Sequence, residues 1–333
     1  MKSKLAIDLG SSFVKIYKAG ADVVLYEPTL IAIENGNYRK PLAVGYDAQK
    51  LVGKTPENVE IIRPIINAEI VNEKALASLV SAFIKKVKAS SVEFNPEVLI
   101  SVQCGSEREV IKQYEKVLNG ANIFNINYAE VPVLSLIGSE APLTDSSSIA
   151  VIDFGGEQTT VCALTLSGVI SGVSMAYGGN KLNEMIIKHI ESEFNLSISN
   201  SQAEKLKIEI ASLVSEDDTK AVISGRDVLS GKTRSMQILA SDIALPVKKF
   251  IDKIIEITNM IFKKLPQEAL LEVKRNGIYL TGGGSNLYGL ADYLSFALGF
   301  EIEKPEESDI ACVIGAGKTI EDKALLNKIK LKI

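Results

Sequence analysis

The sequence predicts an α/β protein built from two related halves. Apolar strand-like segments alternate with amphipathic helical ones, and a strand–turn–strand signature near the start recurs close to the middle of the 333 residues. With 46% hydrophobic and 23% charged residues, the chain has enough apolar side chains for a core. At about 150 residues per domain, this length corresponds to two domains, or to four small ones that share two cores.

The signature near the start consists of two strands joined by a turn. Apolar residues predict a strand over Leu5–Ile7, Asp8–Ser12 breaks it, and a second strand follows over Phe13–Tyr17. The same order recurs in Ile149–Gly156, an apolar strand followed by Asp, one apolar residue, Gly and a small residue, before a strand over Thr160–Leu164. A chance match of two short signatures is the alternative, but internal duplication is the more economical interpretation.

The rest of the first half predicts a small inserted lobe, two helices and a strand. Pro28–Ile70 carries several turn signals and few periodic runs. Apolar residues at helical spacing then predict a helix with Asn72 as its N-cap. A buried strand over Val98–Val102 and a polar helix over about Glu107–Leu118 follow, and the tract Ala141–Ser148 predicts the boundary between the halves.

The second half continues with helices, a hairpin and a glycine-rich connection. Apolar residues at helical spacing predict three helices, over Leu182–Phe194, Ala203–Leu213 and Val247–Leu265. Ala221–Gln237 predicts a hairpin. A strand over Gly277–Thr281 runs into three glycines, and a helix is expected over Leu287–Leu298.

Composition and charge exclude several classes of protein. The net charge of −4 argues against a dedicated nucleic-acid binder. His189 is the only histidine, which disfavours a histidine-based zinc site or a Ser-His-Asp triad. Gly315–Thr319 resembles the tail of a Walker A loop, but Cys312 stands where that motif needs its first Gly, which favours tight glycine-based packing.

The cysteines and the hydropathy pattern predict where the protein works. The three cysteines are scattered and predict no disulfide framework: Cys104, Cys162 and Cys312. No apolar run approaches the roughly 18 residues that a membrane span needs. We therefore expect a soluble, cytoplasmic protein.

Each Asp-x-Gly turn has the composition of a phosphate-binding loop. Backbone N–H groups near Gly10 and Gly155 are unobstructed by side chains and can cradle phosphate oxygens. Asp8 and Asp153, at the ends of their strands, can hold Mg²⁺ through its waters, and Lys15 can add a positive charge to the phosphates. Two facing turns would clamp a polyphosphate from both sides, whereas a single turn is usually an ordinary hairpin.

Two further segments offer nucleotide contacts, each with a structural alternative. Gly282-Gly283-Gly284, between a strand and a helix, fits a close backbone approach to a nucleotide, but it can also be a flexible connection. Glu204 and Lys207 lie one helical turn apart and could hold a ribose and a purine. The alternative for Glu204 is a capping box that begins at Ser201.

Taken in order, these motifs resemble the MreB family of bacterial actins, within the superfamily of actin, DnaK-type chaperone and sugar-kinase ATPases. The likeness covers nearly the whole chain. Beyond the phosphate turns it rests on Glu27-Pro28-Thr29, Ala43-Val44-Gly45, Gly53-Lys54-Thr55-Pro56, Ile62-Arg63-Pro64-Ile65, Ala203-Glu204-Lys205-Leu206-Lys207-Ile208-Glu209-Ile210, Ser224-Gly225-Arg226-Asp227, Leu280-Thr281-Gly282-Gly283-Gly284 and Gly315-Ala316-Gly317-Lys318. Together these segments are specific, although the phosphate turns alone would not separate this family from its relatives.

The resemblance implies an actin-like ATPase fold, with two duplicated halves that form four subdomains around a nucleotide cleft. Subdomain IA would comprise residues 1–28, 73–146 and 310–333, and subdomain IB residues 29–72. Subdomain IIA would comprise residues 147–178 and 240–309, and subdomain IIB residues 179–239.

The resemblance also implies that the cleft holds ATP or ADP with Mg²⁺. Asp8 and Asp153 would hold the metal, and Glu130 would orient the attacking water. The residues that would contact the nucleotide are Gly10, Ser11, Ser12, Phe13, Lys15, Gly155, Gly156, Glu157, Gly179, Glu204, Lys207, Gly282, Gly283, Gly284 and Ser285.

The phosphate turns depart from the family pattern, which in the second turn is usually Asp-Ile-Gly-Gly-Gly-Thr. Gln158 replaces the Thr that helps to hold the water, and Glu157 replaces a Gly and adds a negative charge near the γ-phosphate. Phe13 stands where Asn is usual, and Val131 follows Glu130 where Pro is usual. We predict that ATP binding persists while hydrolysis is slow. The alternative is that Gln158 takes over the role of the Thr.

The resemblance further implies head-to-tail filaments under an anionic membrane, with no nucleic-acid partner and with paralogous actin-like subunits as possible further partners. The family's membrane loop would fall at Ser91–Asn95, with Val92 and Phe94 as its apolar tip. An apolar stripe beside lysines near the C-terminus can also lie on a bilayer, or instead pack on its own domain. The apolar residues are Leu325, Leu326 and Ile329, and the lysines beside them are Lys328, Lys330 and Lys332.

The expected function is that of a cytoskeletal ATPase that forms membrane-associated filaments for cell shape or motility, at the inner face of the cell membrane. One alternative is a non-hydrolysing nucleotide-binding scaffold, which Glu157 and Gln158 motivate. A second is a small-molecule kinase of the same superfamily, which would need an acid or base beyond Glu130. A DnaK-type chaperone is disfavoured because 333 residues leave no room for a peptide-binding domain.

Overall fold

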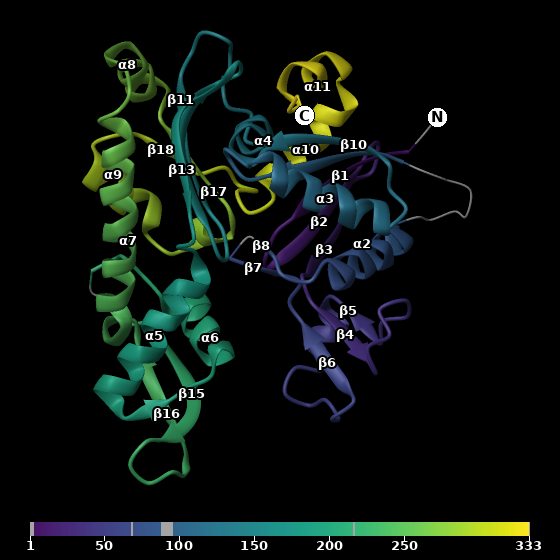
Figure 1. Cartoon of the computed structure of the whole chain (residues 1–333). Coiled ribbons are helices and arrows are strands. Elements are labelled where there is room, and N and C mark those ends of the chain that lie inside the picture. The colour runs from purple at the N-terminus through teal and green to yellow at the C-terminus, as the bar shows by residue number, and fades with distance from the viewer. Residues whose placement is uncertain (1–2, 68, 88–95, 216, 333) are drawn as a thin grey trace.

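The computed structural model describes residues 3–67, 69–87, 96–215 and 217–332. Two α/β lobes lie side by side (Figure 1). The first lobe contains both ends of the described chain, and the second contains most of its middle. We define each lobe as one five-stranded sheet together with the helices and small sheets attached to it.

The two large sheets have the same topology. The first has the order β10-β9-β1-β2-β3 and consists of β1 (Lys4–Leu9), β2 (Phe13–Lys18), β3 (Asp22–Pro28), β9 (Glu97–Val102) and β10 (Asn125–Glu130). The second has the order β18-β17-β11-β12-β13 and consists of β11 (Ile149–Phe154), β12 (Thr159–Thr165), β13 (Gly168–Met175), β17 (Ile278–Thr281) and β18 (Ile302–Glu303). In both, the leading strand pairs antiparallel with the next strand and parallel with a later one. This match confirms the predicted duplication.

The two predicted turns occupy equivalent places in these sheets. Asp8 pairs with Lys15 across β1 and β2, and Asp153 pairs with Thr160 across β11 and β12. Each aspartate is the penultimate residue of its strand. Both turns therefore open at the carboxyl end of the parallel strands, which is the end where α/β sheets generally bind ligands.

Helices cover both faces of the first sheet. The helices α2 (Glu73–Val87) and α3 (Arg108–Gly120) pack on the face that contains Leu5 and Ile7. The opposite face, which contains Ala6, packs against α4 (Val131–Gly138), α10 (Ala311–Glu321) and α11 (Lys323–Ile329). This division follows from the alternation of side chains along a strand. As predicted, Asn72 caps α2, because its Oδ1 accepts the N–H of Ala75 at 2.9 Å.

The second lobe buries its core under longer helices. These are α5 (Gly179–Phe194), α6 (Asn200–Ile210), α7 (Ala240–Phe262), α8 (Gln267–Asn276) and α9 (Leu290–Leu298), with a 3₁₀ turn η1 (Gly283–Asn286). Its small sheet consists of β14 (Leu196–Ser197), β15 (Lys220–Asp227) and β16 (Thr233–Leu239), and it contains the predicted hairpin.

The first lobe also carries several short elements between β3 and α2. These are β4 (Ile31–Glu34), β5 (Ala43–Val44), α1 (Tyr46–Gln49), β6 (Val59–Ile62), β7 (Ile65–Ile66) and β8 (Glu69–Ile70).

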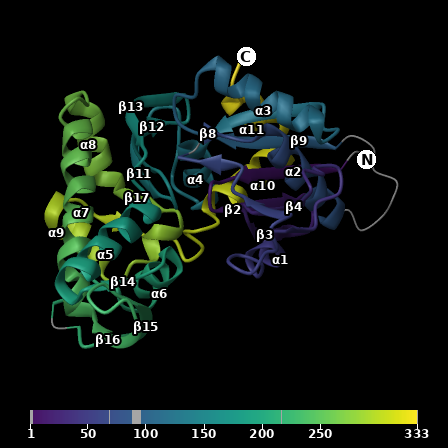
Figure 2. The ribbon, with the colours of Figure 1, turned by 60° about the horizontal axis from the view of Figure 1, so that its bottom comes forward.

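The helix α4 lies between the two sheets and packs against both (Figures 1 and 2). Leu134 belongs to the core of the first lobe, whereas Leu136 packs with β11 and β12 of the second. The helix α10 crosses α4 where neither has room for a side chain. A Cβ on Gly315 would lie 1.8 Å from the Leu134 carbonyl oxygen, and one on Gly138 would lie 1.8 Å from that of Ala311. This confirms the prediction of glycine-based packing and explains why no Walker A loop forms here.

The helix α7 begins at Ala240, earlier than the predicted Val247, and so contains Pro246. A proline has no N–H to donate to the carbonyl group four residues back, which here is that of Asp242. His189 supplies the missing donor, because its Nε2 lies 2.8 Å from the Asp242 carbonyl oxygen. The single histidine therefore stabilises a helix.

The helix α6 begins one turn earlier than the sequence suggests. Its N-cap is Ser199, whose Oγ accepts the N–H of Gln202 at 3.3 Å. Ser201 already lies inside the helix, so the predicted capping box from Ser201 to Glu204 is wrong. The Glu204 carboxylate is consequently available for contacts in the space between the lobes.

Candidate functional site

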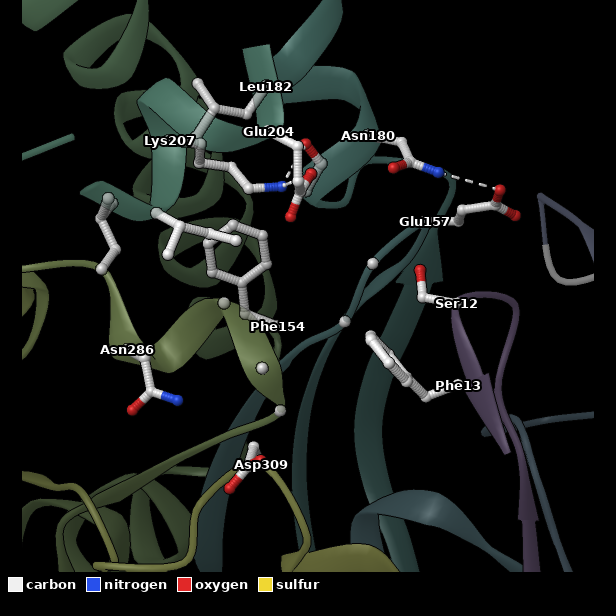
Figure 3. Close-up of a pocket in the computed structure, with 18 of the residues that line it drawn as sticks. Ser12, Phe13, Phe154, Glu157, Asn180, Leu182, Glu204, Lys207, Asn286 and Asp309 are labelled. Atoms are coloured by element: carbon white, nitrogen blue, oxygen red, sulfur yellow. Dashed lines mark hydrogen bonds and ion pairs between the residues drawn. The ribbon is translucent and has the colours of Figure 1, made fainter. Parts of the chain in front are cut away.

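A cavity of about 1580 Å³ lies between the lobes and is lined by both phosphate-type turns. It contains most of the residues that the sequence assigned to a nucleotide and its metal: Asp8, Gly10, Ser11, Ser12, Phe13, Lys15, Asp153, Gly155, Gly156, Glu157, Gln158, Gly179, Glu204, Lys207, Gly282, Gly283 and Gly284. Figure 3 shows Ser12 and Phe13 on one side of it, with Glu204 and Lys207 on the other. The fold therefore brings together residues that are far apart in the sequence.

The two turns have the same internal hydrogen bond and contact each other. The N–H of Gly10 donates to the Phe13 carbonyl oxygen at 3.1 Å, and the N–H of Gly155 donates to that of Gln158 at 2.8 Å. A Cβ on Gly156 would lie only 2.0 Å from the Ser12 Oγ. Glycine at this position therefore allows the two turns to approach closely.

The second turn is also fixed to the start of α5. The N–H of Gly179 donates to the Gly155 carbonyl oxygen at 3.0 Å, and the N–H of Asn180 donates to that of Gly156 at 2.7 Å. A Cβ on Gly178 would lie 2.5 Å from the backbone of the turn. The N-terminus of a long helix, with its partial positive charge, is thus held against the turn.

The two aspartates are half-buried and close enough to interact. Burial raises the pKa of the Asp153 carboxyl group, a hydrogen bond from Thr281 Oγ1 at 2.8 Å partly offsets this, and the negative Asp8 raises it further. Asp8 Oδ1 accepts a hydrogen bond from Ser101 Oγ at 2.7 Å. Among the described residues, no three His, Cys, Asp or Glu side chains converge to hold a metal by themselves. Two carboxylates suit Mg²⁺, which retains several waters and takes phosphate oxygens.

The Lys15 ammonium group is buried among acceptors. Its Nζ donates to the Asp309 carbonyl oxygen at 2.7 Å, lies 3.4 Å from Asp8 Oδ2, and lies 5.4 Å from the centre of the Tyr26 ring. Burial alone would lower the pKa of this lysine, but Asp8 and the other nearby groups outweigh burial and raise it. A fixed positive charge therefore stands behind the first turn.

On the second lobe, Glu204 and Lys207 form an ion pair at the cavity wall. Lys207 Nζ lies 2.6 Å from Glu204 Oε2 and 3.2 Å from the Gly179 carbonyl oxygen. Asn183 also donates to Glu204 Oε2, at 2.6 Å. Burial lowers the pKa of Lys207, although Glu204 counteracts the effect. The pair presents both an acceptor and a donor to the cavity.

The three glycines after β17 are not equivalent. Gly282 has φ +81°, and a Cβ on Gly284 would lie 2.3 Å from the Phe154 ring, whereas no heavy atom lies within 4 Å of a Cβ on Gly283. Ser285, which the resemblance places at the nucleotide, does not line the cavity. It is buried and its Oγ donates to the Gly282 carbonyl oxygen at 2.6 Å, so that part of the prediction is wrong.

The two predicted catalytic residues differ in position. Gln158 lines the cavity, and its Oε1 is buried and accepts no hydrogen bond from the described residues. Glu130 is not among the lining residues, and its Oε1 accepts the N–H of Gly105 at 2.7 Å. Gln158 therefore lies at the cavity with its Oε1 enclosed, whereas Glu130 lies outside the lining.

Several cavity residues escaped the sequence reasoning. Asp309 and Gln103 follow no recognisable motif, and nothing in their local sequence indicates a site. Asn180 could have been found, because the preceding glycine pair at the start of a predicted helix is a typical anion-binding arrangement. Tyr26 lies in β3 and reaches the cavity only through the tertiary fold.

The predicted membrane residues are only partly described. Val92 and Phe94 lie outside the described residues. In the C-terminal helix α11, Leu326 is 4% exposed in the core with α10, and Ile329 packs beside it. Lys328 pairs with Asp145. Leu326 is therefore buried against its own lobe, as in the alternative of a packed terminal helix, and membrane contact through this stripe stays a prediction.

The rest of that tail agrees with this packing. Leu325 and Lys330 are half-buried, and Lys332 is exposed. The backbone N–H of Leu331 donates to the Tyr128 carbonyl oxygen at 2.8 Å. Within the described residues, no helix is both long and apolar enough to cross a membrane.

The model of the MreB/Mbl protein family matches residues 2–328. The chain belongs to the MreB/Mbl family. Within it, the cell shape-determining protein MreB of Escherichia coli K12 is 28% identical over 322 residues, which cover 95% of this chain and 93% of that protein.

Solved structures show which fold this chain shares. The crystal structures of MreB5 of Spiroplasma citri, bound to AMPPNP or to ADP, match with a TM-score of 0.90 and 24% identity, covering 99% of this chain and 98% of theirs. A subunit of the MamK double helical filament matches with a TM-score of 0.80 and 17% identity, covering 97% of this chain and 99% of its own. The fold is therefore actin-like, as the resemblance implied.

Proposed function

We propose that this MreB-family protein binds ATP or ADP with Mg²⁺ in the cavity between its lobes and polymerises into cytoskeletal filaments for cell shape or motility. The observation that carries the proposal is the contact between the two phosphate-type turns at Ser12 and Gly156. The nucleotides bound to MreB5 of Spiroplasma citri and the filament of MamK support it. We keep the four-subdomain division given above as part of this proposal.

The roles of the cavity residues follow from their chemistry. The backbone N–H groups of the two turns would bind phosphate oxygens, with the partial positive charge of the start of α5 beside the second turn, and Lys15 would add its charge from behind the first turn. Asp8 and Asp153 would hold Mg²⁺ through its waters, and the metal would neutralise phosphate charge. Glu204 and Lys207 would contact the ribose and the base.

We propose that hydrolysis is slow. A residue that orients the attacking water must lie within hydrogen-bond reach of it. Gln158 lies at the cavity, but its Oε1 is enclosed and a neutral amide is a weaker base than a carboxylate. The Glu130 carboxylate is engaged by Gly105, and it would have to turn toward the cavity to reach the water. The engagement of the Glu130 carboxylate by Gly105 also favours the alternative of a scaffold that binds nucleotide without hydrolysing it.

One experiment separates these functions. Purified protein is incubated with Mg²⁺ and either ATP, ADP or no nucleotide, and both pelletable polymer and released phosphate are measured. Polymer with slow phosphate release supports the proposal, and polymer without phosphate supports the scaffold. No polymer with any nucleotide would contradict both and leave the small-molecule kinase.

Membrane association is the remaining part of the proposal. Because Leu326 of the tail stripe is buried against its own lobe, we propose that contact with anionic lipid occurs through Val92 and Phe94, as the resemblance implies. Co-sedimentation with anionic liposomes should fall for the Val92→Glu, Phe94→Glu double variant. It should stay unchanged for Lys332→Gln, which alters an exposed tail lysine. Unchanged co-sedimentation of the double variant would contradict this assignment.

A further inference from the structure

Glu157 is buried although it sits at the edge of an open cavity. It replaces a glycine of the family pattern, and a carboxylate beside a phosphate site would repel the ligand. Its side chain does not point to the phosphate turns, however. Its Oε1 accepts a hydrogen bond from Asn180 Nδ2 at 3.1 Å, and its Oε2 accepts one from the backbone N–H of Asn67 (Figure 3 shows the bond to Asn180). The residue is only 8% exposed.

Asn67 belongs to the other lobe. It lies at the turn between β7 and β8, and this hairpin is anchored in the core of the first lobe by Ile65, which is 1% exposed, with Ile70 packed beside it. Glu157 lies in the β11–β12 turn, whose strands form the core of the second lobe. The hydrogen bond from Asn67 to Glu157 therefore crosses from one lobe to the other.

Gln158 reaches the same residue. Its Nε2 lies 3.5 Å from the Asn67 carbonyl oxygen, at the limit of a hydrogen bond. Both contacts of Asn67 use its backbone atoms, and its φ of +52° is the left-handed conformation. The two departures from the family pattern thus hold one backbone residue between them.

We propose that Glu157, assisted by Gln158, is a clasp that holds the two lobes together at the phosphate end of the cavity before any nucleotide binds. The bond from an N–H group to a buried carboxylate is charge-assisted, and such bonds are stronger than those between neutral groups. A contact present only in the closed arrangement shifts the lobes toward it. If the lobes exchange between an open and a closed arrangement, a nucleotide that binds only the closed one then binds more tightly, because less free energy is spent on closing the lobes.

The consequence for the nucleotide rests on the proposed function. A clasp beside the two phosphate turns would slow release of a bound nucleotide, because the lobes must separate there before it leaves. It would also commit the Glu157 carboxylate to donors on both lobes. The added charge would then restrain the opening of the cavity, and its carboxylate oxygens would be unavailable to a metal.

The first test needs no nucleotide. Hydrogen exchange of the Asn67 amide is measured on the nucleotide-free protein, and rates are corrected for intrinsic differences. We expect exchange to be about 10- to 100-fold faster in Glu157→Gly than in the natural protein, since a hydrogen bond to a charged group is lost. Glu157→Gln retains an acceptor without the charge and should fall between the two.

Two control variants sharpen this test. Asn67→Gly keeps the backbone donor, the backbone acceptor and a residue suited to positive φ, so it should keep the slow exchange. Glu184→Gln removes a carboxylate from an exposed pair with Lys181 on the neighbouring helix α5, and should change nothing at Asn67. Equal exchange of Asn67 in the natural protein, Glu157→Gln and Glu157→Gly would overturn the clasp. Glu157→Gln decides alone if Glu157→Gly does not fold.

The second test measures release of a fluorescent ADP analogue. Dissociation should be at least about tenfold faster from Glu157→Gly, while Asn67→Gly and Glu184→Gln should match the natural protein. The two proposals fail in different ways. If the natural protein binds no nucleotide, the proposed function fails while the exchange result stands. If nucleotide binds but neither exchange nor dissociation responds to Glu157→Gly, the clasp is wrong.

Discussion

The adjacent glycines Gly283 and Gly284 should respond very differently to the same substitution. A Cβ on Gly284 would lie 2.3, 2.4 and 2.5 Å from three carbons of the Phe154 ring, more than 1 Å short of the ~3.5 Å at which carbon atoms pack. A Cβ on Gly283 would have no heavy atom within 4 Å. Neither glycine has a positive φ, so any difference is caused by packing and not by backbone conformation.

Phe154 cannot move aside to accommodate the methyl group. It is 2% exposed and stacks on Phe250, with ring centres 5.3 Å apart, and Phe250 in turn stacks on Tyr177 at 4.4 Å. In Gly284→Ala the turn after β17 must therefore shift by about 1 Å toward the cavity. We expect a loss of about 1–3 kcal/mol in the free energy of unfolding, and nucleotide binding at least about tenfold weaker.

Urea unfolding measures the loss of stability, and titration with a fluorescent nucleotide measures the loss of binding. Gly283→Ala is the matched control and should stay close to the natural protein in both measurements.

The Phe154→Leu variant tests the cause, because a smaller side chain makes room for the methyl group. By itself it should cost on the order of 1 kcal/mol. The double variant Phe154→Leu, Gly284→Ala should lose less free energy of unfolding than the two single variants lose together, by about 1–3 kcal/mol. Strict additivity, or equal losses in the two glycine variants, would refute this reasoning.

Three further predictions concern Asp153, Gly315 and His189. Burial raises the pKa of Asp153 in the folded protein, so ionisation of this carboxyl group lowers the free energy of unfolding. This loss is absent below the unfolded pKa near 3.8 and is complete once the pH has risen through the folded pKa. Asp153→Asn should thus raise the Tm of the nucleotide-free protein at pH 7 by about 1–4 °C, and this gain should shrink toward pH 4. The same variant should bind Mg²⁺–nucleotide more weakly. A lowered Tm at pH 7 would contradict this prediction. Gly315→Ala should lower the free energy of unfolding by at least about 2 kcal/mol in urea, despite the better helix propensity of Ala, and a gain would show that α10 can move away from α4. His189→Ala should cost about 1–3 kcal/mol by leaving the Asp242 carbonyl group without a donor, and Pro246→Ala should recover most of that loss by restoring an N–H; no recovery would rule out this role for the histidine.

The arrangement of α4 suggests how the lobes are coupled. This helix starts directly after Glu130 and contacts both sheets, so a change in the angle between the lobes is felt at the residue proposed to orient water. The clasp at Glu157 lies in the β11–β12 turn, and α4 packs against both of these strands. The helix α4 therefore contacts the sheets that carry both phosphate turns.

Local sequence was sufficient for much of the fold and for most of the site. The two Asp-x-Gly turns, their duplication and the glycine triplet could be predicted because they depend on short-range patterns: strand alternation, helical spacing and backbone freedom at glycine. The helix starts of α6 and α7 were predicted less well. At α6 two serines compete as N-cap, and at α7 the penalty for Pro246 is removed by His189, which is distant in the sequence.

The sequence by itself therefore determined that this chain has two related halves, each with a turn suited to phosphate, because those features depend on neighbouring residues. Only the tertiary structure decided what the unusual residues do. It placed Glu157 against Asn67 instead of a phosphate, buried Leu326 in its own lobe and turned Ser285 into the core. Contacts between segments far apart in the chain leave no local pattern, since each depends on where another segment comes to lie.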